Sequence, residues 1–293
     1  MPDWSEIKDQ LRNHGVRVAN DAAKRSVGGG DISDAWRIDT SEGPIFLKTA
    51  VASAFDMFAA EAEGLIEIAS VKAIRVPAVI GCGLTANDSF LATEWLEFDR
   101  SSARVERQLG EKLAQLHRHQ KNRFGWHRNN SIGRTPQENT WSGDWPDFFC
   151  TRRLQYQLDL AAENGYTGEI QHLGEHLVEC LARLFDDYDP AASLLHGDLW
   201  GGNWASSDGQ PVLFDPAVYY GDRESDIAMT RLFGGFGKEF YAAYEASWPL
   251  EPGYEQRCRL YQLYHVLNHL NLFGSSYHGR AVSLMHELCG GRI

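Results

Sequence analysis

Hydrophobic and polar residues follow two different spacings along the chain, and the change falls near residue 99. Before that point, apolar and polar residues alternate in short runs separated by turn residues. This pattern predicts two strands within residues 34–50 and two within residues 78–96. Stretches with helical spacing at residues 4–15 and 54–70 interrupt the strands. The first third of the chain is therefore predicted to be a sheet with one or two helices.

From about Arg100 onward, apolar residues recur at helical spacing. Leu109, Leu113 and Leu116 fall on one face of a helix predicted over residues 104–120. The exception is residues 194–216, where two short apolar runs flank a Ser-Asp-Gly turn and predict a β-hairpin. Further helices are expected over residues 145–165, 169–188, 225–234 and 238–248, and in an aromatic-rich region that runs to the C-terminus.

These patterns predict an α+β fold with two lobes. A small β-rich N-lobe would span residues 1–98, a larger and mainly helical C-lobe would span residues 99–293, and the link would lie near Leu96–Arg100. The 293 residues are long for one compact domain and sufficient for two lobes that share a cleft. Hydrophobic residues make up 43% of the chain, which is enough to bury a core.

The charge balance narrows the classes of partner. The chain has 40 acidic and 28 basic residues, and the resulting net charge of −12 repels nucleic acid and anionic membranes. Nucleotide phosphates are not excluded, because a metal ion and a few local cations can hold them. The five cysteines are scattered without a Cys-x-x-Cys pair, which argues against disulfides or a zinc site and suits the reducing cytoplasm. We recognise no secretory signal and no apolar segment of membrane length.

Three consecutive glycines, Gly28, Gly29 and Gly30, stand ahead of the first long predicted strand. Glycine lets backbone N–H groups approach phosphates closely, as in the loop that covers the phosphates in protein kinases. No Gly-Lys-Ser/Thr follows, so the loop is not a Walker A motif. A flexible turn without a ligand is the simpler alternative, and the sequence leaves it open.

Lys48 closes a run of alternating apolar residues. It is either a solvated lysine at a strand end or a cation that holds the α- and β-phosphates. The second role needs a carboxylate partner on the following helix. Glu61 is our first choice and Glu63 our second, because the two side chains point about 200° apart and only one can face a cleft.

The stretch LLHGDLWGGNW, residues 194–204, carries the strongest signal. Asp198 and Asn203 have the D-x-x-x-x-N spacing of a kinase catalytic loop, and Asp215 follows at the end of the next predicted strand. Phosphoryl transfer needs one carboxylate beside the attacking hydroxyl and further hard oxygen ligands for Mg²⁺. We therefore expect Asp198 to be the catalytic base and Asn203 and Asp215 to be metal ligands. A coincidental polar loop would not also follow a glycine loop and a strand lysine in kinase order.

Several longer runs resemble those of one known family. The runs LLHGDLWGGN, FDPAVYYGDRESDIAMT and LFGGF resemble the fructosamine kinases, also called ketosamine 3-kinases. The segments GGGDISDAW, PIFLK, LATEWL, LGEKLAQLH, DWPDFFCTRRLQYQLDLA and YQLYHVLNHLNLFGSSY are similar too, in family order, so the resemblance covers nearly the whole chain. The wider group is the aminoglycoside phosphotransferase-like kinases, which share the bilobal protein-kinase fold.

The resemblance implies an activity and assigns residues to it. It implies ATP- and Mg²⁺-dependent phosphorylation of the 3-hydroxyl of a ketosamine, the adduct of a sugar with an amine, after which the amine is released. Asp198 matches the family's base, Asn203 and Asp215 match its metal ligands, and Lys48 with Glu61 matches its phosphate-holding ion pair. The strand end ATEWL matches the hinge that holds adenine, through Glu94, Trp95 and Leu96.

The acceptor side is less determined. Trp200 matches a family tryptophan placed against the sugar, although packing of the loop is an alternative. Tyr220 and Glu224 are candidate substrate contacts, since an acidic residue can attract a cationic amine, but a surface turn is an equally good interpretation. A weaker prediction places residues of the last aromatic-rich helix at the edge of the acceptor pocket, namely His265, Asn268 and His269.

Three neighbouring residues have structural interpretations. Trp204 is expected to fill the core under the hairpin, and His117 to be an interior histidine with satisfied hydrogen bonds. Asp226 is expected to hydrogen-bond the backbone of the catalytic loop.

The chain departs from related kinases at three points. The catalytic loop lacks the lysine of protein kinases, which suits a small or flexible acceptor. Pro216 and Ala217 replace Phe-Gly after the metal aspartate, and proline disfavours a flipping switch there. Asp31 stands where some family members have a cysteine after the glycines, so redox control at that loop is not expected.

Other functions remain as alternatives. A kinase for another hydroxyl acceptor, such as an aminoglycoside or an amino alcohol, would use the same motifs. A nucleotide-binding scaffold without catalysis would usually lack the base, the metal aspartate or the lysine, and a phosphate-binding module would not need the D-x-x-x-x-N spacing. We expect a monomer that acts on a small-molecule or protein-bound ketosamine, whose sugar the sequence does not specify.

Overall fold

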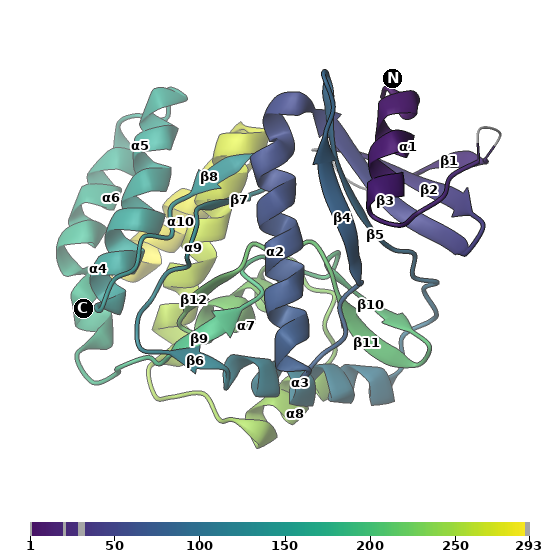
Figure 1. Ribbon diagram of the computed structural model, residues 1–293. Helices are drawn as coiled ribbons and strands as arrows, with labels where there is room; N and C mark the ends of the chain where they lie inside the picture. The colour runs from purple at the N-terminus through teal and green to yellow at the C-terminus, as the bar shows by residue number, and fades with distance from the viewer. Residues whose placement is uncertain (1, 20–21, 29–32, 291–293) are drawn as a thin grey trace.

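The N-terminal third of the protein is built on a five-stranded antiparallel sheet in the order β1-β2-β3-β5-β4 (Figure 1). The computed structural model describes residues 2–19, 22–28 and 33–290. The predicted pairs of strands are confirmed, and β3 pairs with β5 so that Lys48 lies opposite Leu91. The strands are β1 Lys24–Val27, β2 Asp34–Thr40, β3 Gly43–Val51, β4 Val79–Leu84 and β5 Asp88–Glu94.

Two helices cover opposite faces of this sheet. Helix α1, Trp4–Asn13, packs in the cluster that contains Phe90, whereas α2, Phe55–Val71, packs on the neighbouring Leu91. Successive side chains of a strand point to opposite faces, so the two helices lie on different sides. In Figure 1, α2 lies between the sheet and the helical part of the molecule, so one side of the helix faces the sheet and the other faces the helical part.

The rest of the chain is mainly helical, as predicted. Leu109, Leu113 and Leu116 of α3 are all fully buried, which confirms the face read from their spacing. The helix expected over residues 145–165 is less regular, because a π-helical turn at Cys150–Gln155 separates α4 from α5. The helices are α3 Ala103–His117, α4 Trp145–Phe149, α5 Tyr156–Glu163, α6 Glu169–Cys180, α7 Glu224–Leu232, α8 Lys238–Ser247, α9 Tyr254–Phe273 and α10 His278–Gly290. In the described ranges, none of them combines the length and apolar character needed to cross a bilayer.

Short strands in the helical part position the candidate catalytic segments. The hairpin of β10, Trp204–Ser207, and β11, Gln210–Leu213, was predicted from its turn and is confirmed. The β7–β8 hairpin, with strands Asn130–Ile132 and Thr135–Gln137, was not predicted. Nor was the sheet β12-β9-β6, formed by Tyr219–Gly221, Ala192–Leu195 and Gln120–Lys121. Because β9 enters the Asp198 loop and β12 follows Asp215, their pairing brings the two aspartates to one place.

Candidate active site

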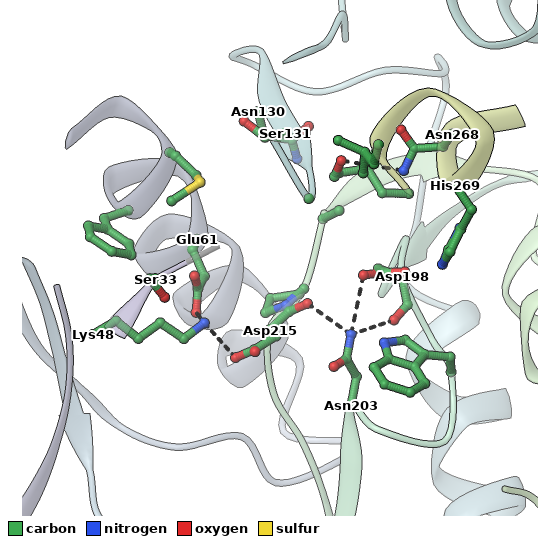
Figure 2. A pocket seen from close by; sticks show the side chains of 18 of the residues that line it. Ser33, Lys48, Glu61, Asn130, Ser131, Asp198, Asn203, Asp215, Asn268 and His269 are labelled. Atoms are coloured by element: carbon green, nitrogen blue, oxygen red, sulfur yellow. Dashed lines mark hydrogen bonds and ion pairs between the residues drawn. The ribbon is translucent and has the colours of Figure 1, made fainter. Parts of the chain in front are cut away.

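A cavity of about 550 Å³ gathers the candidate residues from segments that are far apart in the sequence. Figure 2 shows Lys48 between Glu61 and Asp215, and Asn203 between Asp215 and Asp198. The cavity is lined by Ser33, Phe46, Lys48, Met57, Phe58, Glu61, Asn130, Ser131, Ile132, Gly133, Asp198, Trp200, Asn203, Asp215, Pro216, Ala217, Phe233, Asn268, His269, Leu272, Phe273 and Tyr277.

Lys48 is an ion-paired residue and not a solvated one. Its side chain is only 12% exposed, and Nζ donates hydrogen bonds to Glu61 Oε1 at 2.8 Å and to Asp215 Oδ1 at 2.7 Å. Burial by itself lowers the pKa of Lys48, but the charges of Asp215 and Glu61 outweigh it and raise the pKa above its usual value. The predicted partner, Glu61, is confirmed, whereas Glu63 turns away from the cavity and accepts from Arg128.

The catalytic loop between β9 and β10 turns tightly enough to place Asp198 and Asn203 side by side. Asn203 Nδ2 donates to the main-chain oxygen of Asp198 at 2.8 Å and lies 3.3 Å from its carboxylate Oδ2. Gly197 has φ +83°, and a Cβ there would lie 2.0 Å from the carbonyl oxygen of Ala217. Only glycine fits this position, because a side chain would collide with the backbone of Ala217, two residues after Asp215.

The buried side chain of Asp226 fixes the backbone of the loop that carries Asp198. Its carboxylate accepts the backbone N–H groups of His196 at 2.7 Å and Gly197 at 2.9 Å, which confirms the predicted role. His117, fully buried as predicted, contacts the same carboxylate through Nε2 at 3.1 Å and Tyr244 through Nδ1 at 2.8 Å. Trp204 is also buried as expected. Asp198 therefore projects from a loop whose backbone is fixed by a buried anion.

The electrostatic environment suits a base that accepts a proton near neutral pH. Burial raises the pKa of Asp198 to about 7, and the nearby charges of Asp215 and Asp226 add to the rise, while the hydrogen bond from Asn203 opposes it. Burial also raises the pKa of Glu61; the ammonium of Lys48 opposes that rise and the charge of Asp215 adds to it. General bases work best when their pKa lies near the working pH.

Asn203 and Asp215 fit as ligands of Mg²⁺ by the chemistry of their free atoms. Asn203 uses its amide nitrogen in the hydrogen bonds above, which leaves Oδ1 for a cation, and Lys48 occupies only Oδ1 of Asp215. Mg²⁺ prefers oxygen ligands and is commonly held by one or two carboxylates together with phosphates and water. Within residues 2–19, 22–28 and 33–290, no three His, Cys, Asp or Glu side chains converge on one point, so a cation here would share its ligands with phosphate oxygens.

Asp215 has an uncommon backbone conformation. Its φ is +56°, in the left-handed region, and Pro216 follows it. Such a conformation costs on the order of 1 kcal/mol outside glycine and is typical of functional positions that the surroundings hold in place. It turns the carboxylate toward Lys48 (Figure 2).

The side of the cavity beyond Asp198 is an aromatic wall, which we define as Phe233, His269, Phe273 and Tyr277. The ring of His269 lies 4.8 Å from Phe233, 5.4 Å from Phe273 and 5.1 Å from Tyr277, measured between ring centres. Burial lowers the pKa of His269, which favours the neutral ring, while the hydrogen bond with the His265 carbonyl opposes this shift. Trp200 also lines the cavity and is 41% exposed.

This wall was only partly predicted. Asn268 and His269 line the cavity as expected, whereas His265 does not and is buried behind them. Phe233, Phe273 and Tyr277 were missed. The four-residue spacing of His269 and Phe273 was an available signal, because it places both side chains on one face of α9; Tyr277 follows in a separate short turn after Gly274.

The structure contradicts the predicted substrate contacts of Tyr220 and Glu224. Both side chains are fully buried and neither lines the cavity. Tyr220 donates its hydroxyl to Glu67 at 2.6 Å, and Glu224 forms a two-bond ion pair with Arg257 at 2.7 and 3.0 Å. The alternative of a surface turn is wrong as well, because both residues are buried: Tyr220 contacts α2, and the ion pair of Glu224 links α7 to α9.

The predicted nucleotide-binding segments are only partly described. Gly28 is exposed, while Gly29, Gly30 and Asp31 lie outside the described residues. Glu94 ends β5, but its carboxylate is engaged by Arg75 at 2.8 Å, and neither it nor Trp95 nor Leu96 lines the cavity. The cavity therefore does not reach the strand end that was predicted to hold adenine.

Comparison with known proteins identifies close relatives. The sequence pattern of the family described as "Fructosamine kinase" matches residues 3–290. A "probable ketoamine kinase" of Synechocystis is 42% identical over 286 residues, which is 97% of this chain and 96% of the relative. A chloroplastic protein-ribulosamine 3-kinase of Arabidopsis thaliana is 42% identical over 266 residues, or 89% of this chain and 81% of the relative.

Solved structures agree with these relatives. A crystal structure described as a "Putative fructosamine-3-kinase" from Haemophilus somnus superposes with a TM-score of 0.89 at 31% identity and covers 97% of each chain. The ADP-bound aminoglycoside phosphotransferase APH(2'')-Ib gives a TM-score of 0.64 at 14% identity, with 98% of each chain covered. The second likeness is one of fold alone.

Proposed function

Because this chain belongs to the fructosamine kinase family, it is an ATP-dependent kinase of ketosamines with a bilobal kinase-like fold, and we propose that Asp198 is its catalytic base. The observation that carries this proposal is the convergence of Asp198, Asn203, Asp215 and Lys48 on one cavity. In the reaction we propose, the sugar 3-hydroxyl oxygen forms a bond to the γ-phosphorus of ATP, the bond from that phosphorus to the β-phosphate oxygen breaks, and ADP leaves. The hydroxyl proton passes to Asp198.

The other groups of the cavity bind and orient. Lys48 would hold the phosphates from the sheet side, and Asn203 and Asp215 would hold Mg²⁺, which neutralises phosphate charge when it is bound. A cation beside Asp215 would also weaken the repulsion that raises the pKa of Asp198. Residues 1–98 would thus form the nucleotide lobe, with adenine near the backbone of Glu94–Leu96, and residues 99–293 the catalytic lobe.

We propose that the acceptor binds between Trp200 and the aromatic wall. An aromatic face beside the base can pack on a sugar ring and attract the cationic amine of a ketosamine. All five cysteines are free, which fits a reducing cytoplasm, and we expect the protein to act there as a monomer.

The test of the base is Asp198→Asn. We expect Mg·ATP to bind with unchanged affinity while kcat falls by several orders of magnitude, because the amide cannot accept the hydroxyl proton. Calorimetry measures binding, and coupled release of ADP measures turnover of ribulosyl-lysine. Asp187→Asn, the same change at an exposed site, should leave both unchanged. Full activity of Asp198→Asn would remove Asp198 as the base.

The test of the substrate is a panel of ribulosyl-lysine, fructosyl-lysine, kanamycin and choline with Mg·ATP, followed by phosphorus NMR. We expect phosphate on the sugar of one or both ketosamines. Turnover of kanamycin or choline alone would favour the alternative, a kinase for another hydroxyl acceptor.

A further inference from the structure

Helix α2 carries three glutamates whose carboxylates go to three different places. Glu61 pairs with Lys48 of the sheet. Glu63 accepts from Arg128 Nη1 at 2.6 Å and lies 2.7 Å from His127 Nε2. Glu67 accepts the hydroxyl of Tyr220 at 2.6 Å. One face of α2 thus serves the ion pair, and the other is fastened to the helical lobe at two successive turns.

The fastened face also packs closely. A Cβ added at Gly64 would lie 3.0 Å from Cγ2 of Val218, so the helix backbone comes nearer to this segment than most residues would allow. Val218 lies three residues after Asp215. Helix α2 therefore touches the stretch that carries the proposed metal ligand.

The β7–β8 hairpin, which begins two residues after Arg128, completes the connection. Asn130 Nδ2 donates to the carbonyl oxygen of Val218 at 2.8 Å, and Gln137 Nε2 donates to that of Ala217 at 3.3 Å. Gln137, which is buried, also donates to Asn130 Oδ1 at 2.8 Å, so a side-chain hydrogen bond ties the two strands together. The same hairpin lines the cavity from Asn130 to Gly133.

These contacts close a ring. It runs from Asp215 through Lys48 and Glu61 into α2, then through Glu63 and Arg128 into the hairpin, and back to Val218. In Figure 1 the hairpin and the sheet lie on opposite sides of α2, as this ring requires. A displacement of α2 away from the sheet would break the Lys48–Glu61 pair, and a displacement away from the hairpin would break the Glu63–Arg128 contact.

We propose that Glu63 and Arg128 are positioning residues that hold α2 so that the Lys48–Glu61–Asp215 cluster is assembled before nucleotide binds. The inference rests on the proposed function, because that function gives the Lys48–Glu61–Asp215 cluster its role in holding the phosphates of ATP. It also deepens the proposed function, because the helix that carries Glu61 is held by a residue next to a hairpin that lines the same cavity. Phosphorylation or a partner is then not needed to bring α2 into place.

The experiment compares Glu63→Gln, Arg128→Gln and the double variant with the wild type in Mg·ATP binding by calorimetry. The contact is partly exposed, at 41% and 26% for the two side chains. We therefore expect each single variant to weaken binding about 5-fold, which is the scale of one such ion pair, and the double variant to be no weaker than either single. Hydrogen exchange over residues 55–71 should be faster in all three variants.

Glu239→Gln is the matched control, because it removes another partly exposed glutamate–arginine contact, 2.8 Å from Arg107, on helices that do not line the cavity. It should change Mg·ATP binding less than 2-fold, an effect on the scale of experimental error. Binding by Glu63→Gln that equals that of Glu239→Gln would overturn the proposal. So would losses that multiply in the double variant to about 25-fold, since independent effects add in free energy.

The readout separates this inference from the proposed activity. Calorimetry with Mg·ATP needs no ketosamine, so a wild-type protein that binds nucleotide but phosphorylates none of the ketosamines refutes the proposed function and leaves the positioning test intact. Where turnover is measured, Glu63→Gln should raise KM for ATP with little effect on the KM for the ketosamine at saturating ATP.

Discussion

Asp226 is the residue at which one substitution should affect both stability and catalysis in a measurable way. Its side chain is 1% exposed and accepts from three donors, the backbone N–H groups of His196 and Gly197 and the ring of His117. Asparagine has the same shape but only one acceptor oxygen, so its amide group must face at least one of these donors. The perturbation is therefore Asp226→Asn.

The magnitude follows from the lost contacts. A buried donor left without a partner costs about 1–3 kcal/mol, and hydrogen bonds to a charged acceptor contribute about 1.5–3 kcal/mol each. We expect Asp226→Asn to lower the free energy of unfolding by about 3 kcal/mol, which corresponds to a Tm decrease of about 5–10 °C for a chain of this size. Because Asp198 follows directly after the released N–H groups, kcat should fall about 100-fold.

The effect on stability should depend on pH with a defined sign. Burial by itself raises the pKa of Asp226, but the hydrogen bond and charge of His117, with His196 and the N–H of Gly197, lower it below its usual value. The folded pKa thus lies below the unfolded one, so the carboxylate stabilises the fold above pH about 4 and loses this effect as the pH falls through the folded pKa. Asparagine does not titrate. The stability difference between wild type and variant should be full at pH 7 and shrink below pH about 4.

The assay is urea unfolding followed by tryptophan fluorescence at pH 7 and below pH about 4, together with coupled release of ADP for kcat at pH 7. Asp187→Asn, at an exposed site, is the control and should match the wild type. Stability of Asp226→Asn within about 0.5 kcal/mol of the wild type at pH 7 would refute the reasoning, because substitutions at unimportant surface sites have effects of that size. A difference that grows in acid would show that the pKa is displaced in the other direction.

Two further substitutions test the geometry of the site. Gly197→Ala places a Cβ 2.0 Å from Ala217 O and should either prevent folding or lower the free energy of unfolding by about 3 kcal/mol or more. Gly209→Ala, at φ +67° with no atom within 4 Å, is the control and should lower it by only about 1 kcal/mol. Equal Tm values of the two variants would contradict the predicted collision. Trp200→Ala should raise KM for the ketosamine about 10-fold and leave KM for ATP unchanged, because it removes an exposed aromatic face on the acceptor side of the cavity. Steady-state kinetics with each substrate varied in turn measures both constants. A rise in KM for ATP alone would assign the tryptophan to the nucleotide.

Local chemistry explains which parts of the fold were predictable. The spacing of Leu109, Leu113 and Leu116 identified a helix face that is fully buried, and the Asp208-Gly209 turn identified the β10–β11 hairpin. By contrast, β7, β8 and β12 have three residues each, and such short strands show no period of their own. They exist because their neighbours supply the other half of each hydrogen-bond ladder.

The acidic residues after Asp215 show where sequence reasoning failed. Acidic and aromatic residues in a loop are as typical of a binding surface as of a buried network, and the sequence does not state which partner each will meet. Arg257, which neutralises Glu224, lies 33 positions away on α9, and Glu67, which accepts from Tyr220, lies 153 positions away on α2. Those pairings follow only from how the helices pack.

The sequence by itself determined the chemistry of this protein. The D-x-x-x-x-N spacing, the strand lysine and the aspartate after the hairpin are local patterns that identify the candidate reactive groups. The fold then brings them together, since Lys48 pairs with Asp215 across 167 positions of the chain. Tertiary structure settled the choice between the two glutamates that the sequence offered, since Glu61 faces Lys48 and Glu63 binds Arg128. It alone decided that Phe233, Phe273 and Tyr277 enclose His269. The physical reason is that a helix fixes the angle between its side chains but not its own rotation, which is set by what it packs against.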